Sequence, residues 1–214
     1  MAPWRRACRR SSAVPERRVP GAGVCAIVLA AGQGSRYRAA SGADKLLAPS
    51  LSDAPVPPVL AATLANLRGV AERLLVVTRA DNGPLHDWLA AHAGDCERLL
   101  VETRGLGHSL AQAVAHAPAA RGWLVALGDM PYVQPATLRA IVAAIDHDNL
   151  VVPVHQGRPG HPRGIGGAYR ERLLQLDGDR GAQALFARHA VQQLEVDDPG
   201  VLQDIDHPDD RRRC

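Results

Sequence analysis

Three things are scarce in this 214-residue sequence: aromatic side chains, cysteine motifs and long apolar runs. Aromatic residues make up 3% of the chain, too few for the stacking platforms on which single-stranded nucleic acids bind. The cysteines are far apart and form no CxxC pair, which argues against a structural zinc site and a disulfide framework. No apolar run has the length of a transmembrane helix or of a signal-peptide core. We therefore expect a cytoplasmic protein with neither a membrane nor a nucleic-acid partner.

Positive charge is concentrated at the amino terminus. The formal net charge is +3, but residues 1–23 hold six arginines and one glutamate, a charge of +5, so residues 24–214 carry −2. The segment 1–23 is also rich in proline and serine, which is typical of a disordered chain. We predict a disordered, arginine-rich tail over residues 1–23 and one domain over residues 24–214.

Short apolar runs alternate with helical patterns along the rest of the chain. The predicted strands lie at residues 24–30, 73–78, 97–101, 123–127 and 150–154, and the predicted helices at 58–68, 84–92, 106–117 and 135–145. This alternation predicts a Rossmann-like α/β fold, in which a mostly parallel, mixed sheet has helices on both faces. Because ligands of such sheets bind beyond the carboxyl ends of the strands, the loops after Ala30, Thr78, Val101 and Leu127 should share one rim.

A glycine-rich turn follows the first predicted strand in the sequence VCAIVLAAGQGSR. Gly32 and Gly34 let the backbone approach a ligand closely, and amides that turn inward bind anions. Arg36 and Lys45 lie just beyond and are placed to neutralise a phosphate chain. The pattern is neither the GxxxxGK[ST] of a P-loop nor the GxGxxG of a dinucleotide site. It indicates a nucleotide phosphate site, with an ordinary strand-to-helix turn as the alternative.

A carboxylate stands at the carboxyl end of the strand 123–127, in the sequence GDMP. Asp129 is held between Gly128 and Pro131, and Mg²⁺ favours one or two carboxylates together with phosphate oxygens. We therefore expect Asp129 to bind Mg²⁺ opposite the glycine-rich turn. The alternative is an aspartate that caps the helix beginning near Gln134.

The segment 157–164, GRPGHPRG, is too rich in glycine and proline for regular structure and is expected to be a shaped loop over a pocket. His161 within it either orients a substrate phosphate or carbonyl, or is an ordinary exposed loop histidine. We expect the other histidines to lie on the surface.

The sequence GLGHS at 105–109 opens a predicted helix, so that free amides and the Ser109 hydroxyl face the same rim. Base or ribose binding and simple capping of the helix by serine are both open. Near the end of the chain, Asp206 lies in the acidic sequence DIDHPDD and either reaches the metal or belongs to a solvated turn. No GxSxG elbow is present, and we expect no covalent catalysis.

Together these motifs resemble the nucleotidyltransferases of molybdenum cofactor maturation, the MobA-like superfamily, and specifically its molybdopterin cytidylyltransferase branch. The resemblance runs from Val24 to about Asp210 and rests on six blocks in order, which are LAAGQGSR with DKLLAP, GLGHSLAQAV, LGDMPYV, GRPGHPRGI, LDGDRGAQAL and VDDPGVLQDIDHPDD. It implies a fold like that of the nucleotide-diphospho-sugar transferases. It also implies Mg²⁺-dependent transfer of CMP from CTP to the terminal phosphate of molybdopterin, with release of pyrophosphate.

The resemblance assigns roles to individual residues. It implies catalytic roles for Arg36, Lys45 and Asp129 and metal ligands at Asp129 and Asp206. It implies substrate contacts at Gly160, His161 and Pro162. The implied nucleotide contacts are Leu29, Ala30, Ala31, Gly32, Gly34, Ser35, Gly107, Ser109 and Gly128. The opening Ala30-Ala31-Gly32 is similar to that of cytidylyl members and implies CTP, and a molybdoenzyme apoprotein is an implied partner.

The chain departs from the family pattern between Arg36 and Lys45. Family members usually place this lysine about five residues after the arginine, whereas here the two are nine apart, with Arg38-Ala-Ala-Ser-Gly inserted. Arg163 also follows Gly-His-Pro where a hydrophobic residue is commoner. The alternative functions are guanylyl or other nucleotidyl transfer to molybdopterin or a sugar phosphate, a Rossmann-type oxidoreductase, and a non-catalytic protein that delivers the cofactor.

Overall fold

The computed structural model describes residues 23–52 and 56–212. The predicted disorder of the tail concerns residues that lie, apart from Gly23, outside the described ones. The core of the fold is one eight-stranded sheet in the order β3-β2-β1-β4-β7-β5-β6, with β8 paired to β5. Its strands are β1 (Val24–Leu29), β2 (Arg73–Arg79), β3 (Glu97–Val101), β4 (Gly122–Leu127), β5 (Leu150–His155), β6 (Arg158–Pro159), β7 (Arg163–Gly166) and β8 (Gln192–Glu195).

Strands β3, β2, β1 and β4 run parallel, and β7 pairs antiparallel with β4. All six residues of β1 are buried, as expected for a strand with neighbours on both sides and helices on both faces. The strand order reverses at β1, so a crevice opens beyond the carboxyl ends of β1 and β4. The α/β fold class, the mixed sheet and the predicted strands of the amino-terminal half are confirmed.

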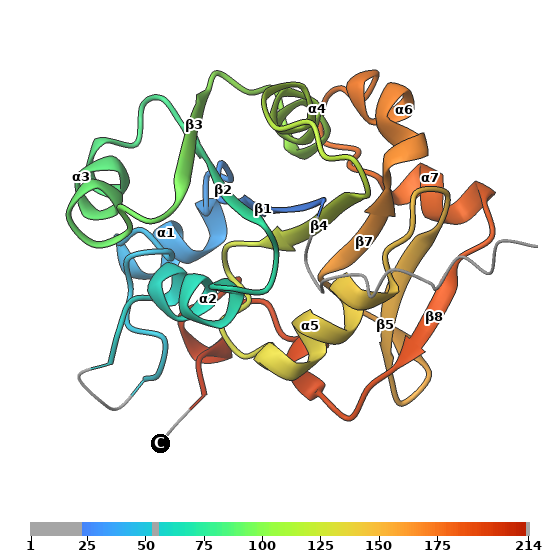
Figure 1. Ribbon diagram of the computed structural model, residues 1–214. Coiled ribbons are helices and arrows are strands. Elements are labelled where there is room, and N and C mark those ends of the chain that lie inside the picture. Colours follow the sequence, from blue (N-terminus) through green and yellow to red (C-terminus); the bar gives the residue numbers. More distant parts are fainter. Residues whose placement is uncertain (1–22, 53–55, 213–214) are drawn as a thin grey trace, which may run out of the picture.

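Helices cover both faces of the sheet (Figure 1). Side chains of α2, α3 and α5 join the apolar core on one face, and those of α4, α6 and α7 join the core on the other. The helices are α1 (Ser35–Ser41), α2 (Val59–Leu67), α3 (Gly83–His92), α4 (Leu106–His116), α5 (Pro135–Ala144), α6 (Arg170–Leu174) and α7 (Gln183–Arg188), with 3₁₀ turns η1 (Gly167–Tyr169), η2 (Pro199–Leu202) and η3 (Pro208–Asp210). Within the described part of the chain, no helix is long and apolar enough to cross a membrane.

The prediction that residues 157–164 lack regular structure is wrong. They contribute β6 and the start of β7, and β7 lies between β4 and β5 in the middle of the sheet. Glycine is needed there for packing, because a Cβ atom on Gly164 would lie 2.7 Å from Ile145 Cγ1 and one on Gly166 would lie 2.4 Å from the Asp146 carbonyl oxygen. Composition alone does not distinguish a glycine that packs closely from a glycine that turns.

The surface prediction for the histidines other than His161 is wrong for His155, which is buried at the end of β5 with its Nδ1 3.0 Å from the Val196 carbonyl oxygen. Cys25 and Cys96 are buried free thiols. Burial raises the pKa of each to about 11, so neither is a reactive thiolate at neutral pH.

Candidate active site

A cavity of about 620 Å³ opens at the carboxyl ends of the parallel strands. Its walls come from residues 29–33 after β1, Arg79 at the end of β2, residues 103–106 and Ser109 after β3, and Leu127 and Asp129 after β4. Lys45, Leu46 and Asp179 complete the lining. The prediction that the loops after these four strands share one rim is therefore confirmed.

Lys45 lies between two carboxylates in this cavity. Its Nζ is 2.5 Å from Asp129 Oδ2 and 3.3 Å from Asp206 Oδ1. The side chains of Lys45 and Asp129 are only 12% and 16% exposed, whereas that of Asp206 is 36% exposed. Lys45 is the only lysine in the sequence, and the other permanently charged basic side chains are arginines. A compact ammonium contacts both carboxylates through one nitrogen, whereas a larger planar guanidinium would need a different arrangement of the two.

Burial and charge act against each other in this cluster. Desolvation by burial holds the pKa of Asp129 above its usual range, against the opposing charge of Lys45. For Lys45, burial lowers the pKa, but the two carboxylates outweigh it and hold the pKa above its usual range. Lys45 is therefore a fixed positive charge at physiological pH. Burial also acts to raise the pKa of Asp206, but Lys45 and Arg36 outweigh it and hold that pKa low.

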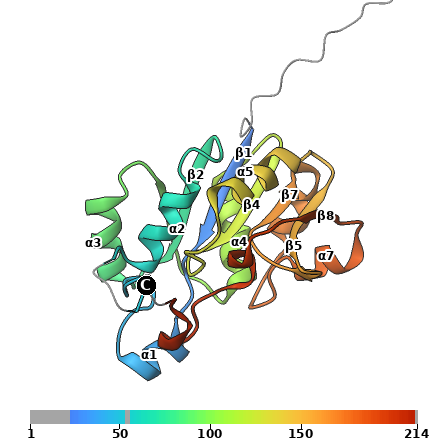
Figure 2. The ribbon, with the colours of Figure 1, turned by 90° about the horizontal axis from the view of Figure 1, so that it is seen from below.

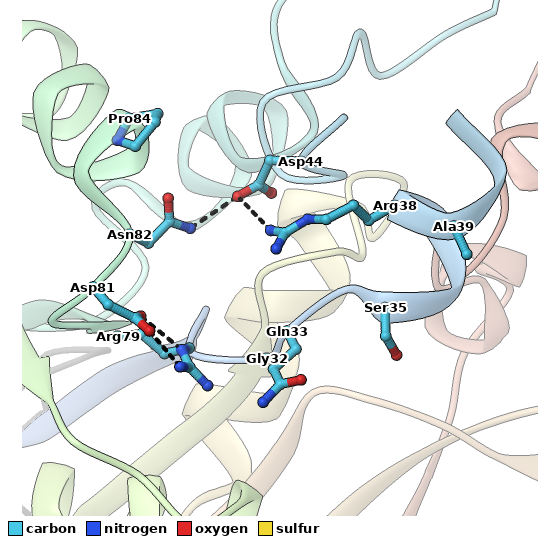
Figure 3. Close-up of a pocket in the computed structure, with 10 residues that line it drawn as sticks. All are labelled: Gly32, Gln33, Ser35, Arg38, Ala39, Asp44, Arg79, Asp81, Asn82 and Pro84. Atoms are coloured by element: carbon cyan, nitrogen blue, oxygen red, sulfur yellow. Dashed lines mark hydrogen bonds and ion pairs between the residues drawn. The ribbon is translucent and has the colours of Figure 1, made fainter. Parts of the chain in front are cut away.

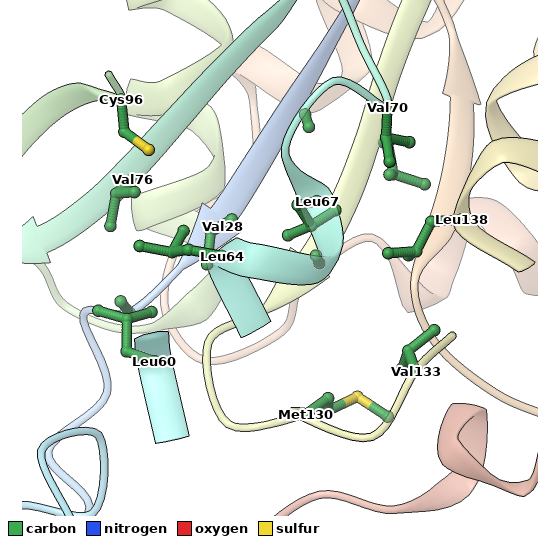
Figure 4. Packing of buried hydrophobic residues seen from close by; sticks show 14 of the residues in the cluster. Val28, Leu60, Leu64, Leu67, Val70, Val76, Cys96, Met130, Val133 and Leu138 are labelled. Atoms are coloured by element: carbon green, nitrogen blue, oxygen red, sulfur yellow. The ribbon is translucent and has the colours of Figure 1, made fainter. Parts of the chain in front are cut away.

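The loop that carries Asp129 is anchored on three sides. Before it, the Gly128 amide donates to the Leu29 carbonyl oxygen at 3.0 Å, which ties the end of β4 to β1. Behind it, Met130 and Val133 are buried against α2 and α5 (Figure 4). Beside it, the amide of buried Ile205 donates to the Asp129 carbonyl oxygen at 3.0 Å. The last contact places Asp206, the residue after Ile205, next to Asp129.

Asp206 belongs to the carboxyl-terminal turn, which lies beside α1 (Figure 2). The Asp210 carboxylate accepts hydrogen bonds from the amides of Asp206 and His207, so the turn is rigid. Arg36 Nη1 donates to Asp206 Oδ2 from α1, and the Arg36 side chain is 70% exposed. Arg36 therefore reaches the cluster from its solvent side and does not line the cavity.

The glycine-rich turn forms one edge of the cavity. Gly32 and Gln33 line it, and Gly34 has a φ of 57° with its Cα facing the aliphatic part of Lys45. Ser35 faces instead a second cavity of about 760 Å³, which shares Gly32, Gln33 and Arg79 with the first (Figure 3). The glycine-rich turn thus lies between two neighbouring cavities.

The start of α4 forms the opposite edge. Ser109 is buried inside α4, donates its hydroxyl to the Gly105 carbonyl oxygen at 3.0 Å and lies 2.7 Å from Thr103 Oγ1. It is not the cap of α4, because Gly105 occupies that position. Gly107 does not line the cavity: its amide donates to the Gly178 carbonyl oxygen, and a Cβ there would lie 2.4 Å from the Arg180 carbonyl oxygen. Its role in the structure is to admit the 177–180 segment.

The other predicted contacts lie beside the cavity. Gly128 is buried against β1 and does not line it. Gly160 packs on η2, where the His161 amide donates to the Val201 carbonyl oxygen at 2.9 Å. Pro162 borders a hollow of about 10 Å³ behind Met130. Burial, with a contribution from Arg163, lowers the pKa of His161 to about 4, and His161 Nδ1 has no hydrogen-bond partner. His161 is therefore a neutral, half-buried imidazole.

The structure differs from the predicted arrangement in two respects. Asp129 was expected opposite the cations of the first turn, but it contacts Lys45 directly. A capping role for Asp129 at α5 is also not observed, because no side chain among the described residues caps the amino terminus of α5. The amide of Gln134, the residue before α5, donates instead to Asp198 at 2.9 Å. The alternation of apolar and polar residues gave no signal for Asp198, Thr103, Arg104 or Asp179, since all four lie in irregular segments.

Comparison with known proteins decides the family. Residues 26–194 match the MobA-like NTP transferase domain. The chain belongs to this family. It is a MobA-like nucleotidyltransferase whose substrates the match does not specify. The bifunctional protein GlmU of Ralstonia pickettii strain 12J is 32% identical over 145 residues, which cover 62% of this chain and 28% of GlmU. The chain thus matches less than a third of that relative's length.

Solved structures agree with the family. Rv0371c of Mycobacterium tuberculosis H37Rv is 33% identical with a TM-score of 0.75, covering 90% of this chain and 96% of that one. Rv0371c has also been solved in complex with manganese. A nucleotidyl transferase of Methanothermobacter, Mth528, is 28% identical with a TM-score of 0.70 over 87% of this chain and 93% of that one. The more distant CMP:2-keto-3-deoxy-manno-octonic acid synthetase, 12% identical over 87% of this chain and 94% of that one, has a TM-score of 0.62 and shares the nucleotide-diphospho-sugar transferase-like fold.

Proposed function

We propose that this nucleotidyltransferase, a single domain over residues 24–214, transfers CMP from CTP to the terminal phosphate of molybdopterin and releases pyrophosphate. One observation carries the proposal: a single buried ammonium, Lys45, lies between Asp129 and Asp206 on the wall of a cavity bounded by the glycine-rich turn. The cavity has space for a nucleotide. The MobA-like family supports nucleotidyl transfer, and the six sequence blocks support the acceptor.

The choice of CTP is supported by the opening Ala30-Ala31-Gly32, which resembles the cytidylyl branch. Ala30 and Ala31 are buried with small side chains, so the base end of a nucleotide meets backbone groups rather than long side chains at this wall. Thr103, Arg104 and Ser109 supply hydroxyl and guanidinium groups on the facing wall. Hydrogen bonds from such groups discriminate between bases more strongly than apolar contacts do.

The residues support a transfer by positioning and charge. A phosphate oxygen of the acceptor forms a bond to the α-phosphorus while the bond from this phosphorus to the pyrophosphate oxygen breaks. Such a displacement needs mainly alignment and neutralisation of the charge that moves to the leaving group. Lys45 supplies a fixed positive charge inside the cavity, and Arg36 supplies one at its solvent edge. Gly32 and Gln33 line the cavity, and their amides would donate to phosphate oxygens.

The two carboxylates fit a divalent cation such as Mg²⁺. Asp129 Oδ1 is buried without a hydrogen-bond partner, and carboxylate oxygens are the ligands that hard cations prefer. Asp129 and Asp206 would hold the ion, and the manganese complex of Rv0371c supports a divalent ion in a relative. Among the residues that the structure describes, no cluster of three or more such side chains forms a ready-made metal cage. When bound, the ion would neutralise charge on the phosphates.

The proposed acceptor contacts are Gly160, His161 and Pro162. They lie behind the Asp129 loop, where Pro162 packs beside Met130. His161 is neutral at physiological pH because its pKa is lowered to about 4, so it offers hydrogen bonds without a charge. A molybdoenzyme apoprotein that accepts the finished cofactor is the proposed downstream partner.

The decisive experiment measures pyrophosphate release with molybdopterin, Mg²⁺ and each of CTP, GTP, ATP and UTP. We expect release with CTP, and loss of at least a hundredfold in Lys45→Ala, the scale of one preorganised electrostatic contact. Thermal stabilisation by each nucleotide provides an independent readout of base preference. Equal stabilisation by all four nucleotides would exclude the CTP assignment, and release only with a sugar phosphate as acceptor would replace molybdopterin.

A further inference from the structure

Between Arg36 and Lys45 the chain completes α1, which lies outside the cavity, and then turns back so that Lys45 lines the cavity. Of the inserted residues, 38–41 form the last turn of α1, and Gly42, with a φ of 72°, ends the helix by donating its amide to the Arg38 carbonyl oxygen at 2.7 Å. Ala43 and Asp44 then lead to Lys45. Because residues 39–43 are all exposed, the inserted segment itself gives Lys45 little support from packing.

The support comes from Asp44, the residue before Lys45. Asp44 Oδ1 accepts from the Leu46 amide at 2.9 Å, so the carboxylate spans the backbone of Lys45. Its backbone carbonyl oxygen accepts from the Ala48 amide at 3.1 Å, which closes the turn on the other side. The Asp44 side chain is 19% exposed. Asp44 therefore braces the backbone on both sides of Lys45, next to buried Leu46, whose carbonyl oxygen accepts from the Leu60 amide of α2 at 3.0 Å.

The second carboxylate oxygen of Asp44 connects this turn to α3. Asn82 Nδ2 donates to Asp44 Oδ2 at 2.8 Å across the wall of the larger cavity (Figure 3). Asn82 is itself immobilised, because its Oδ1 accepts from the Leu85 amide at the start of α3. Arg38 Nη2 is 3.9 Å from Asp44 Oδ2 and adds only a weak contact. Asn82 thus joins the lysine turn to a helix whose Leu85 and Leu89 are buried.

We propose that the hydrogen bond between Asp44 and Asn82, here called the tether, acts with the backbone bonds to α2 to position Lys45 between Asp129 and Asp206. Asp44 and Asn82 are positioning residues, since neither lines the cavity that holds Lys45 and both act through that lysine. The structural claim depends only on the hydrogen bonds described above, and its kinetic consequence rests on the proposed function. This hydrogen bond explains how Lys45 still reaches the cavity although it lies nine positions after Arg36.

Exchange of the two side chains tests the tether. In Asp44→Asn, the new amide can still accept from the Leu46 amide, but its NH₂ group then faces the NH₂ group of Asn82. Asn82 cannot rotate to relieve this conflict without losing its bond to the Leu85 amide. Asn82→Asp instead opposes two carboxylates. The double exchange Asp44→Asn with Asn82→Asp restores one donor and one acceptor, and aspartate caps a helix as well as asparagine does.

Because Lys45 is the only lysine, its accessibility can be read without interference from other side-chain amines. Brief acetylation with acetic anhydride, without nucleotide or metal, is followed by mass spectrometry, with the α-amino group as internal reference. We expect Asp44→Asn to raise the rate of Lys45 acetylation roughly tenfold, the scale of one hydrogen bond to a charged group. The double exchange should return it to within about twofold of the wild type, because two residues in direct contact are energetically coupled and the exchange restores their hydrogen bond.

Two further variants keep this test decisive. Asn82→Ser retains a good capping residue but is too short to reach Asp44, so it should raise the acetylation rate as Asp44→Asn does while α3 stays intact. Asp87→Asn removes an exposed carboxylate from the same helix and should leave the rate unchanged. Wild-type acetylation in both Asp44→Asn and Asn82→Ser, or a raised rate that the double exchange does not reverse, overturns the proposal.

Kinetics separate the tether from the proposed function. If wild-type protein releases pyrophosphate with CTP and molybdopterin, Asp44→Asn should lower kcat roughly tenfold to a hundredfold, the cost of a displaced catalytic group. In a Lys45→Ala background the same change should cost no more than about twofold, because it acts through a group already removed. A full additional loss there overturns the proposal. If the wild type is inactive with every nucleotide, the proposed function fails, whereas the acetylation result still decides the tether.

Discussion

Replacement of Lys45 by methionine tests the charge balance of the site most directly. Methionine preserves much of the side-chain volume but leaves Asp129 without the ammonium that lies 2.5 Å from it. At an effective dielectric constant of about 20, two unit charges at that distance attract by roughly 7 kcal/mol, before the desolvation of both groups is subtracted. Breaking a buried pair by removal of one partner costs about 3–5 kcal/mol.

We expect a loss near the lower limit, about 3 kcal/mol, because both side chains keep some contact with water. For a domain of this size, that loss lowers Tm by roughly 6–12 °C. The assay is thermal unfolding at pH 7.5 with EDTA. The matched control is Arg139→Met, which removes an exposed cation from α5 and should change Tm by less than about 2 °C.

A divalent cation provides the second half of this experiment. If Asp129 and Asp206 bind Mg²⁺, the ion replaces the missing positive charge, and millimolar Mg²⁺ should restore part of the lost Tm in Lys45→Met while it leaves Arg139→Met unchanged. A Tm equal to that of the wild type in EDTA would falsify the claim that Lys45 neutralises buried charge. An unchanged deficit in Mg²⁺ would exclude the proposed metal ligands.

Three further predictions follow from other contacts. Asp198→Ala leaves the amides of Gln134 and Gly200 without their acceptor and should lower the free energy of unfolding by about 3 kcal/mol, measured in urea. The kcat for pyrophosphate release should not change. A loss below about 1 kcal/mol would contradict the role of Asp198 as acceptor for both amides. The folded pKa of His161 is about 4 against 6.5 unfolded, so only the unfolded state gains the proton between these values. The contribution of His161 to the free energy of unfolding is then fully present above pH 6.5 and falls by about 3 kcal/mol as the pH falls to 4. His161→Gln should reduce this decline in urea unfolding curves measured across the pH range. An unchanged dependence of the unfolding free energy on pH in the variant would refute the prediction. Gly105→Val places a Cβ 2.3 Å from Asp179 Oδ1 and should abolish thermal stabilisation by nucleotide, whereas Gly94→Ala, whose Cβ meets open space, should leave it unchanged. Undiminished stabilisation in Gly105→Val would show that nucleotide binding does not depend on the position of Asp179.

Much of the fold follows from local pattern. The apolar run at 24–30 predicts β1 to within one residue, and the predicted helix at 135–145 differs from α5 only at its last residue. The predictions failed where neighbours in space override composition. Residues 163–166 form a central strand because their glycines fit against residues 145–147, and the composition of the preceding residues, which include Pro159 and Pro162, does not reveal this fit.

Part of the candidate site could also be predicted from the sequence. Chain order and strand direction place the loops after β1, β2, β3 and β4 on one rim, so Gly32, Ser109 and Asp129 were predicted near one another. The positions of Gly107 and Gly160 were not, because each is a glycine that admits a backbone segment from far along the chain. Such close contacts leave no periodic signal.

The sequence alone determined the strands β1–β5, the helices α2–α5, their order and the chemical types available at the rim, because periodicity and turn chemistry act over a few residues. Tertiary structure decided the pairing of those groups. Lys45 meets Asp129 from 84 positions away and Asp206 from 161 positions away, and Asn82 reaches Asp44 from 38 positions away. Coulomb attraction and hydrogen bonding depend on distance in space, and that distance is set only when the sheet, its helices and the carboxyl-terminal turn have packed together.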